Sequence, residues 1–190
     1  MCGRFTASFE FREIKLLFNL QRDIPLLTPR YNIAPSQEVP VIIQNDGKNE
    51  LTPMKWGLVP SWAPDKSIGN QMINARAETL TEKPSFKRLV QQRRCLIPAN
   101  GFYEWRREGN RKVPVWIHLK NREPFAFAGL WDLWRDPEGE TLYNVYNRPD
   151  RARCFASAHR QPHAVIFDKL LPSSGSTGCL VLAMPASRQY

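Results

Sequence analysis

The sequence predicts a single-domain α+β fold, built mainly from an antiparallel, barrel-like β-sheet with a few short helices. Three observations lead to this prediction. Short apolar runs bounded by turn residues recur along the chain, only two segments have helical spacing, and no internal repeat or linker divides the sequence. The 190 residues match the length of one domain, and a core of that size needs neither disulfides nor metals.

The first half of the chain gives one helix signal and one hairpin signal. Residues 10–19 carry apolar side chains at helical spacing with charges on the other face, which predicts a short amphipathic helix. A proline-containing loop then leads to an apolar strand at Val39–Ile43, and the Asp-Gly turn behind it predicts a hairpin. The next strand ends in a proline-rich loop, in which we expect Trp56 to be a core residue and Trp62 to be exposed.

The second half is dominated by strand signals. Residues 85–94 predict a second short helix. Residues 94–119 indicate two strands around the turn "REGNRK", and residues 124–134 indicate a further, aromatic-rich strand that ends at the turn "DPEGE". These frequent turns between short strands favour the barrel-like sheet.

Charge and cysteine usage restrict the class of protein. The formal net charge is +9 and the pI is about 9.7, an excess that favours a polyanionic partner such as nucleic acid, although some proteins are basic for solubility alone. Neither a secretion signal nor an apolar run of membrane-spanning length is found, so we expect a cytoplasmic protein with no membrane partner. The four cysteines lack metal-ligand spacing and are expected to be free thiols.

The second residue, Cys2, is the main candidate for reactivity. If Met1 is removed, the chain begins with a 1,2-aminothiol whose amine, with a reference pKa of about 7.7–8.0, is partly neutral near neutral pH. The nearby Arg4 would favour the thiolate. An aldehyde would form an imine with the amine, and the thiol would close a thiazolidine ring. Cys2 could instead cleave amides as a nucleophile, or be a small residue at a disordered terminus.

Other candidate residues lie in three short motifs. In "INARAET", Asn74 would orient a substrate by hydrogen bonds and Arg76 would bind a phosphate with its planar fork. In "GFYEW", Glu104 lies among aromatic residues, which suits a carboxyl group to proton transfer. In "GLVPSWAP", Trp62 would stack on unpaired bases. The alternatives are ordinary surface charges for the first two motifs and a core aromatic residue for the third.

Six segments together resemble one family. "MCGRF", "RYNIAPSQ", "KWGLVPSWA", "INARAET", "SFK" and "CLIPANGFYEW" occur in order between residues 1 and 105, and the resemblance runs to about residue 143. They resemble the SOS-response-associated peptidase family, whose members shield abasic sites in single-stranded DNA. Each motif alone is weak, whereas six in order behind a cysteine at position 2 are specific.

The resemblance implies a single-domain α+β fold and a peptidase or hydrolase that releases its own N-terminal cysteine. It also implies covalent capture of the ring-opened sugar aldehyde at an abasic site in the DNA damage response, with an associated lyase activity. By motif, the catalytic residues would be Cys2, Asn74 and Glu104, and the DNA-binding residues would be Arg4, Trp62 and Arg76. Only Met1 precedes Cys2 here, so ordinary methionine removal would also expose it.

The resemblance also bears on partners and cofactors. The implied partner is single-stranded DNA containing abasic sites, bound by a monomer in a nucleoid-associated, cytoplasmic location. Imine chemistry needs no metal and no organic cofactor, so none is expected. Net positive charge would attract the phosphates, and DNA binding should weaken steeply with salt.

The C-terminal part departs from the family pattern. We therefore divide the chain into an SRAP-like domain at residues 1–143 and a divergent tail at residues 144–190. The tail has no Glu, against eleven before it, and has five Arg and one Lys against two Asp. We interpret this shift as a frameshift near residue 144, which would leave the tail partly disordered. The family's histidine, which assists ring opening, has only His159 or His163 as a counterpart, with His159 nearer in frame.

Two other functions remain open from the sequence. The first is an N-terminal-nucleophile amidohydrolase or protease that uses Cys2 without an aldehyde. The second is a non-enzymatic, basic protein that binds single-stranded nucleic acid through charge and tryptophans.

Overall fold

The computed structural model describes residues 3–21, 28–74, 84–119 and 122–148 of the chain. The helices are α1 (Phe11–Leu17), the short 3₁₀ helix η1 (Lys66–Asn70) and α3 (Pro84–Gln92). The strands are β1 (Arg4–Ala7), β2 (Arg30–Ile33), β3 (Glu38–Asn45), β4 (Lys48–Trp56), β5 (Arg94–Ala99), β6 (Gly101–Glu108), β7 (Arg111–Ile117), β8 (Phe125–Arg135) and β9 (Thr141–Arg148).

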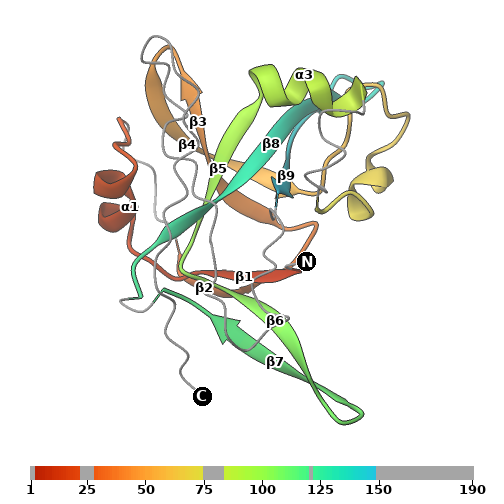
Figure 1. The fold of residues 1–190 in the computed structure, drawn as a ribbon. Coiled ribbons are helices and arrows are strands. Elements are labelled where there is room, and N and C mark those ends of the chain that lie inside the picture. Colours follow the sequence, from red (N-terminus) through yellow and green to blue (C-terminus); the bar gives the residue numbers. More distant parts are fainter. Residues whose placement is uncertain (1–2, 22–27, 75–83, 120–121, 149–190) are drawn as a thin grey trace.

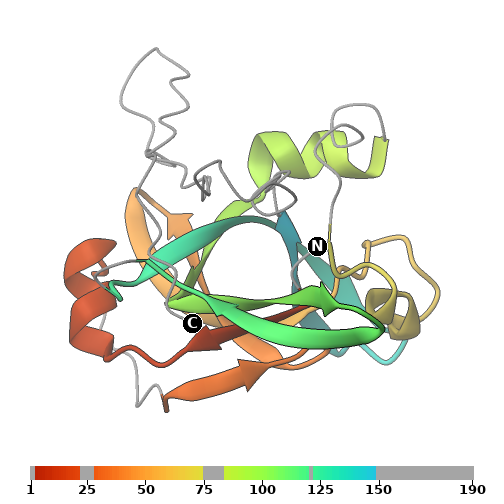
Figure 2. The same cartoon turned by 60° about the horizontal axis from the view of Figure 1, so that its bottom comes forward.

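The strands form two sheets that lie against each other. Five strands close into a barrel in the order β3-β4-β9-β8-β5, and four form a second sheet in the order β2-β1-β6-β7. All pairs are antiparallel except β4 with β9. Figure 1 shows the four-stranded sheet below the barrel, with α3 across the top, and Figure 2 looks into the ring of barrel strands. The predicted α+β, mainly antiparallel and barrel-like fold is confirmed.

The core lies where the barrel meets the four-stranded sheet. Phe5 of β1 packs edge-on against Trp56 of β4 and Phe127 of β8, with ring centroids 5.2 and 5.8 Å apart. Phe102 of β6 reaches the same Phe127 ring at 5.8 Å. Edge-to-face aromatic pairs at these separations are favourable, so the cluster fixes how the two sheets meet. The burial of Trp56 confirms that it is a core residue.

Several elements agree with the sequence-based predictions. The helix predicted at residues 10–19 is α1, and the one predicted at residues 85–94 is α3. The β3–β4 hairpin closes at the Asn45–Lys48 pair, so its turn is the predicted Asp-Gly. Gly47 there has a φ of 74°, a left-handed conformation that suits a residue without a Cβ.

The segment at residues 94–119 forms three strands, so the prediction of two strands was wrong. β5 belongs to the barrel, whereas β6 and β7 belong to the four-stranded sheet. The chain changes sheets at Asn100, where the carboxamide accepts from the Ser8 N–H at 3.0 Å and donates to the Ser8 hydroxyl at 2.7 Å. The Asn100 carboxamide thus satisfies the backbone N–H of Ser8, which follows the end of β1.

Strand β9 crosses the predicted boundary between residues 143 and 144. Asn144 and Val145 are buried in the barrel wall, and their backbones pair with Asp132 and Trp131 of β8. Residues 149–190, with His159 and His163, lie outside the described residues, so the two-part division stays a prediction. In the part of the chain that is described, no helix is long and apolar enough to cross a membrane.

Candidate functional site at the start of strand β1

Strands β1 and β6 place two predicted site residues on adjacent strands. Arg4 pairs with Tyr103, and Phe5 pairs with Phe102. Opposite residues of an antiparallel pair share a face, so Phe5 and Phe102 point toward the barrel whereas Arg4 and Tyr103 point away. Glu104, two residues after Phe102, shares the barrel-facing side. The side chains of Arg4 and Glu104 therefore lie on opposite faces of one sheet.

The strand register also relates Glu104 to the reactive end predicted from the sequence. Continuing the β1–β6 register by one residue brings Gly3 opposite Glu104. Opposite Cα atoms of an antiparallel pair are up to about 5.5 Å apart, so we expect the Gly3 and Glu104 Cα atoms to be about that close. A half-buried carboxylate thus lies beside the first residue that the structure describes. Cys2 itself lies outside the described residues.

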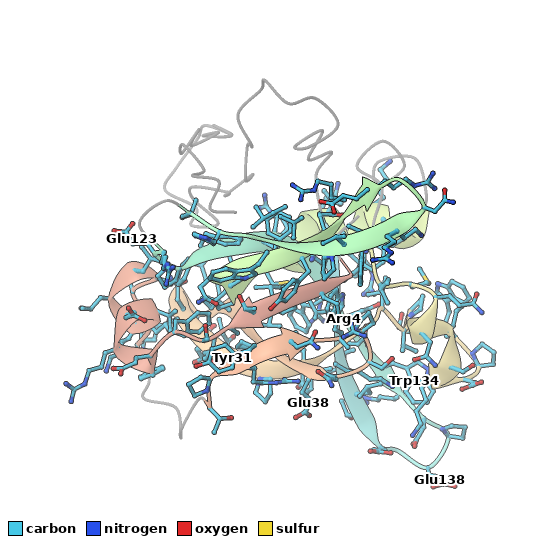
Figure 3. The ribbon with its side chains drawn as sticks, turned by 90° about the horizontal axis from the view of Figure 1, so that it is seen from below. Arg4, Tyr31, Glu38, Glu123, Trp134 and Glu138 are labelled. Carbon is cyan, nitrogen blue, oxygen red and sulfur yellow. The ribbon has the colours of Figure 1, made fainter. Side chains whose placement is uncertain are left out.

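The outward face of the same sheet combines charge with exposed aromatic rings. The Arg4 guanidinium donates to the Asn32 side chain at 2.9 Å. Trp105 of β6 is 57% exposed and Tyr31 of β2 is 67% exposed. Figure 3 shows Arg4 and Tyr31 on the side of the molecule that it views. Sequence reasoning missed both aromatic residues, although each lies within a quoted motif beside a charged residue.

Asn74 is held at the end of strand β9. The backbone carbonyl of Asn74 accepts a hydrogen bond of 2.5 Å from the Tyr146 hydroxyl. The backbone carbonyl of Ile73, the preceding residue, accepts one of 3.0 Å from the Trp56 indole N–H. Asn74 also forms an isolated parallel bridge with Asn147. Burial raises the pKa of Tyr146 to about 12, so its hydroxyl remains a donor at neutral pH. Arg76, two residues on, lies outside the described residues.

Trp62 is exposed on a loop whose backbone is fixed on both sides of it. The Trp62 side chain is 64% exposed. The N–H of Ser61 donates to the buried Asp132 carboxylate at 3.3 Å, and the carbonyl of Ala63 accepts from the Trp134 indole at 2.8 Å. Both partners come from β8, so the barrel wall presents the Trp62 ring to solvent in a defined place. The predicted exposure of Trp62 is confirmed.

Asp132 has a second role, because it also pairs with helix α3. Both carboxylate oxygens accept from the Arg88 guanidinium, at 3.1 and 3.2 Å. Asp132 is buried whereas the Arg88 side chain is about half exposed, so the arginine supplies charge compensation and keeps contact with water. The Trp62 loop, strand β8 and helix α3 thus share one buried carboxylate.

Two buried asparagines on β9 differ in hydrogen bonding. The Asn144 carboxamide accepts from the N–H of Val59 at 3.0 Å and donates to the carbonyl of Leu142 at 3.2 Å. Asn147 is equally buried, yet among the residues that the structure describes neither its amide nitrogen nor its amide oxygen has a hydrogen-bond partner. Sequence reasoning did not single out either residue.

The arrangement has definite chemical capacities. Glu104 is able to exchange protons near the start of β1. The backbone at Ile73 and Asn74 is held in place by hydrogen bonds from Trp56 and Tyr146. Arg4 and the exposed aromatic rings suit phosphates and bases. Among the described residues, no three His, Cys, Asp or Glu side chains are grouped so that they could hold a metal ion.

Fold and site together define an α+β domain in which the start of the chain runs along a carboxylate-bearing strand beside a closed barrel. The family model described as SOS response associated peptidase (SRAP) matches residues 1–146. The chain belongs to this family, as its sequence motifs predicted.

Relatives and solved structures agree with this assignment. The chain is 50% identical over 146 residues to the abasic site processing protein YoqW of Bacillus subtilis (75% of this chain, 65% of the relative). It is 36% identical to the abasic site processing protein YedK of Escherichia coli (68% of this chain, 59% of the relative). The chain thus spans about two thirds or less of the lengths of these relatives.

A crystal structure of a protein from Bacteroides thetaiotaomicron matches with a TM-score of 0.70 at 30% identity, covering 77% of this chain and 67% of that one. The crystal structure of a phage-related protein from Bordetella bronchiseptica matches with a TM-score of 0.65 at 28% identity, and the match covers 87% of this chain and 78% of that one.

Proposed function

We propose that this protein captures abasic sites in single-stranded DNA through Cys2, as part of a DNA damage response such as the SOS response. Membership of the SRAP family, relatives named for abasic site processing and a net charge of +9 support the proposal. The observation that supports it most directly is the β1–β6 register, which pairs Arg4 with Tyr103, so that Glu104 is the next residue of β6 on the side of the chain's first residues.

The reaction requires a free amine on Cys2. Met1 is removed by the peptidase activity of the family or by ordinary methionine removal. The amine then attacks the aldehyde carbon of the opened sugar, and the adduct loses one water to become an imine. The Cys2 sulfur adds to the imine carbon while the thiol proton passes to the nitrogen, which closes a thiazolidine. One water is released overall, and nothing is oxidised or reduced.

The other site residues have separate parts in this scheme. Glu104 accepts and returns the protons of imine and ring formation. Asn74 orients the opened sugar, while Arg4 and Arg76 hold phosphates on either side of the lesion. Trp62 stacks on a neighbouring base, where its fixed loop limits the entropy lost on binding. His159 remains our candidate for assisting ring opening.

Mass spectrometry of the intact protein tests the proposal. The full chain is mixed with a single-stranded oligonucleotide from which one uracil has been excised. We expect an adduct whose mass equals the protein without Met1 plus the DNA minus one water. Cys2→Ser should abolish the stable adduct and retain salt-sensitive DNA binding. Retention of Met1, or absence of any wild-type adduct, would contradict the proposal.

The same experiment separates the other functions. Cleavage of a peptide or amide by wild type, with no dependence on aldehyde, would indicate an N-terminal-nucleophile amidohydrolase. DNA binding without an adduct would indicate a non-enzymatic binding protein.

A second pair of variants tests the role of Glu104. Glu104→Gln should slow adduct formation about 10²-fold, a typical contribution of general acid–base catalysis. Glu108→Gln, on the same strand, is the matched control, because Glu108 pairs with Arg106 at the exposed end of the hairpin. Equal rates for the two variants would remove Glu104 from the mechanism.

A further inference from the structure

The side chain of Asn147 is buried without hydrogen bonds. It is 1% exposed, and its amide nitrogen and amide oxygen have no hydrogen-bond partner in the described part of the chain. Folded proteins pair nearly all such groups, because an unpaired buried amide destabilises the folded state. Asn147 lies beyond the predicted boundary at residue 143, yet it pairs with Gly129 inside the barrel wall, so its unpaired amide needs an explanation in the folded protein. One explanation is a ligand that supplies the missing hydrogen bonds.

The residues that pair with Asn147 across the barrel wall are apolar, whereas its bridge partner Asn74 has a buried amide oxygen. Asn147 pairs with Gly129 of β8, and Gly129 pairs with Cys95 of β5, so the three residues form one row across the wall. Gly129 adds no side chain to this row. Burial raises the pKa of the Cys95 thiol above its usual range, and burial is the sole cause of that shift. Within this row of described residues, the Asn147 carboxamide has no strong polar partner.

The position of Asn147 links it to the proposed site. Its backbone bridges to Asn74, and the adjacent Tyr146 hydroxyl donates to the Asn74 carbonyl. Figure 1 shows that β9 ends toward the start of β1. Val145, on the same face of β9 as Asn147, belongs to the core cluster that contains Phe5. The unpaired amide thus lies on the side of β9 that faces β1.

We propose that Asn147 is a substrate-binding residue whose carboxamide hydrogen-bonds a hydroxyl group of the opened sugar. This inference rests on the proposed function. A hydroxyl both donates and accepts, and it therefore matches the amide oxygen and the amide nitrogen together. A phosphate only accepts, and burying its charge in this apolar row would be costly. The neutral part of the abasic nucleotide is the ligand that fits.

The test compares two aldehydes under single-turnover conditions. The full chain reacts either with single-stranded DNA containing one abasic site or with propanal, which has an aldehyde and no hydroxyl. Asn147→Val should slow the DNA reaction about five- to tenfold, the effect of losing one or two neutral hydrogen bonds, and should leave the propanal reaction unchanged. Val145→Ala is the control, because it perturbs the same face of β9 and removes no amide.

The outcomes are distinguishable. A wild type that forms no adduct with abasic DNA would refute the proposed function itself. A wild-type adduct that forms equally fast in Asn147→Val would refute only the role of Asn147. Equal slowing with propanal, or equal slowing in Val145→Ala, would also overturn that role, because the effect would then come from general damage to the strand. Slowing confined to DNA and to Asn147→Val supports the inference.

Discussion

Replacing Asn147 with valine is expected to raise the free energy of unfolding, whereas the same replacement at Asn144 is expected to lower it. The two residues lie three positions apart on β9, and both are almost completely buried. The substitution is identical, and it exchanges a carboxamide for a β-branched side chain that suits a strand. The two side chains point to opposite faces of β9, and they also differ in hydrogen bonding, which is the property that the comparison tests.

The expected magnitudes follow from the hydrogen bonds that each amide makes. A buried polar group without a partner costs about 1–3 kcal/mol. Asn147→Val removes two such groups and should stabilise the protein by about 2 kcal/mol. Asn144→Val leaves the Val59 N–H and the Leu142 carbonyl without these partners, so it should destabilise by about 2–3 kcal/mol. At about 2–4 °C for each kcal/mol in a chain of this size, the two melting temperatures should move in opposite directions by several degrees.

The assay is thermal and urea unfolding of the full chain at neutral pH without DNA, followed by far-UV circular dichroism. The urea slope must stay constant, so that a change of midpoint reports stability. A lower midpoint for Asn147→Val would show that its amide is satisfied in the free protein, for instance by a buried water. Loss of equal stability at both sites would likewise refute the reasoning.

Three further predictions concern buried groups elsewhere in the fold. Tyr146→Phe should cost about 1 kcal/mol through the lost hydrogen bond to Asn74. The folded state raises the pKa of Tyr146 to about 12 from its usual 10, so wild type should also lose stability as the pH rises from 10 toward 12. Urea titrations of Tyr146→Phe should show a smaller loss over the same pH range. Arg88→Ala should destabilise by about 2 kcal/mol or more and Asp132→Ala by less, since the first leaves a buried carboxylate without its charge partner and the second leaves a guanidinium that is half exposed to water; a smaller loss for Arg88→Ala in urea titrations would contradict this. Cys95 should resist iodoacetamide in the native protein and react after denaturation, as peptide mass spectrometry would show; fast native labelling would contradict its burial.

Local patterns predicted the elements that local interactions determine. The amphipathic spacing of α1, the Asp-Gly turn between β3 and β4 and the "REGNRK" turn between β6 and β7 are signals carried by adjacent residues. Strands β1 and β2 have four residues each and lack a clear alternation, so their pairing depends on distant partners. The change of sheet at Asn100 was missed for the same reason, because it depends on a contact with Ser8, which is 92 residues away.

The candidate site was predictable where residue chemistry was sufficient and unpredictable where strand geometry decided. Motifs identified Glu104, Asn74 and Trp62, but only the register shows that Glu104 shares a face with Phe102 and that Arg4 points the other way. Asn147 was not predicted because its sequence neighbours give no sign of burial. An asparagine in the segment "YNVYNR" resembles a loop residue until the pairing with β8 places it inside the barrel wall.

Strand β9 ties these features together, because successive residues serve different parts of the site. Asn144 holds Val59 in the loop that leads to Trp62, Tyr146 holds Asn74, and Asn147 carries the unpaired amide. Side chains alternate along a strand, so a slip of one residue in the β8–β9 register would turn every one of these groups to the wrong face. The strand therefore closes the barrel and sets the site geometry at once. Variants on β9 should accordingly separate into those that lower stability, such as Asn144→Val, and those that raise it while slowing capture, such as Asn147→Val.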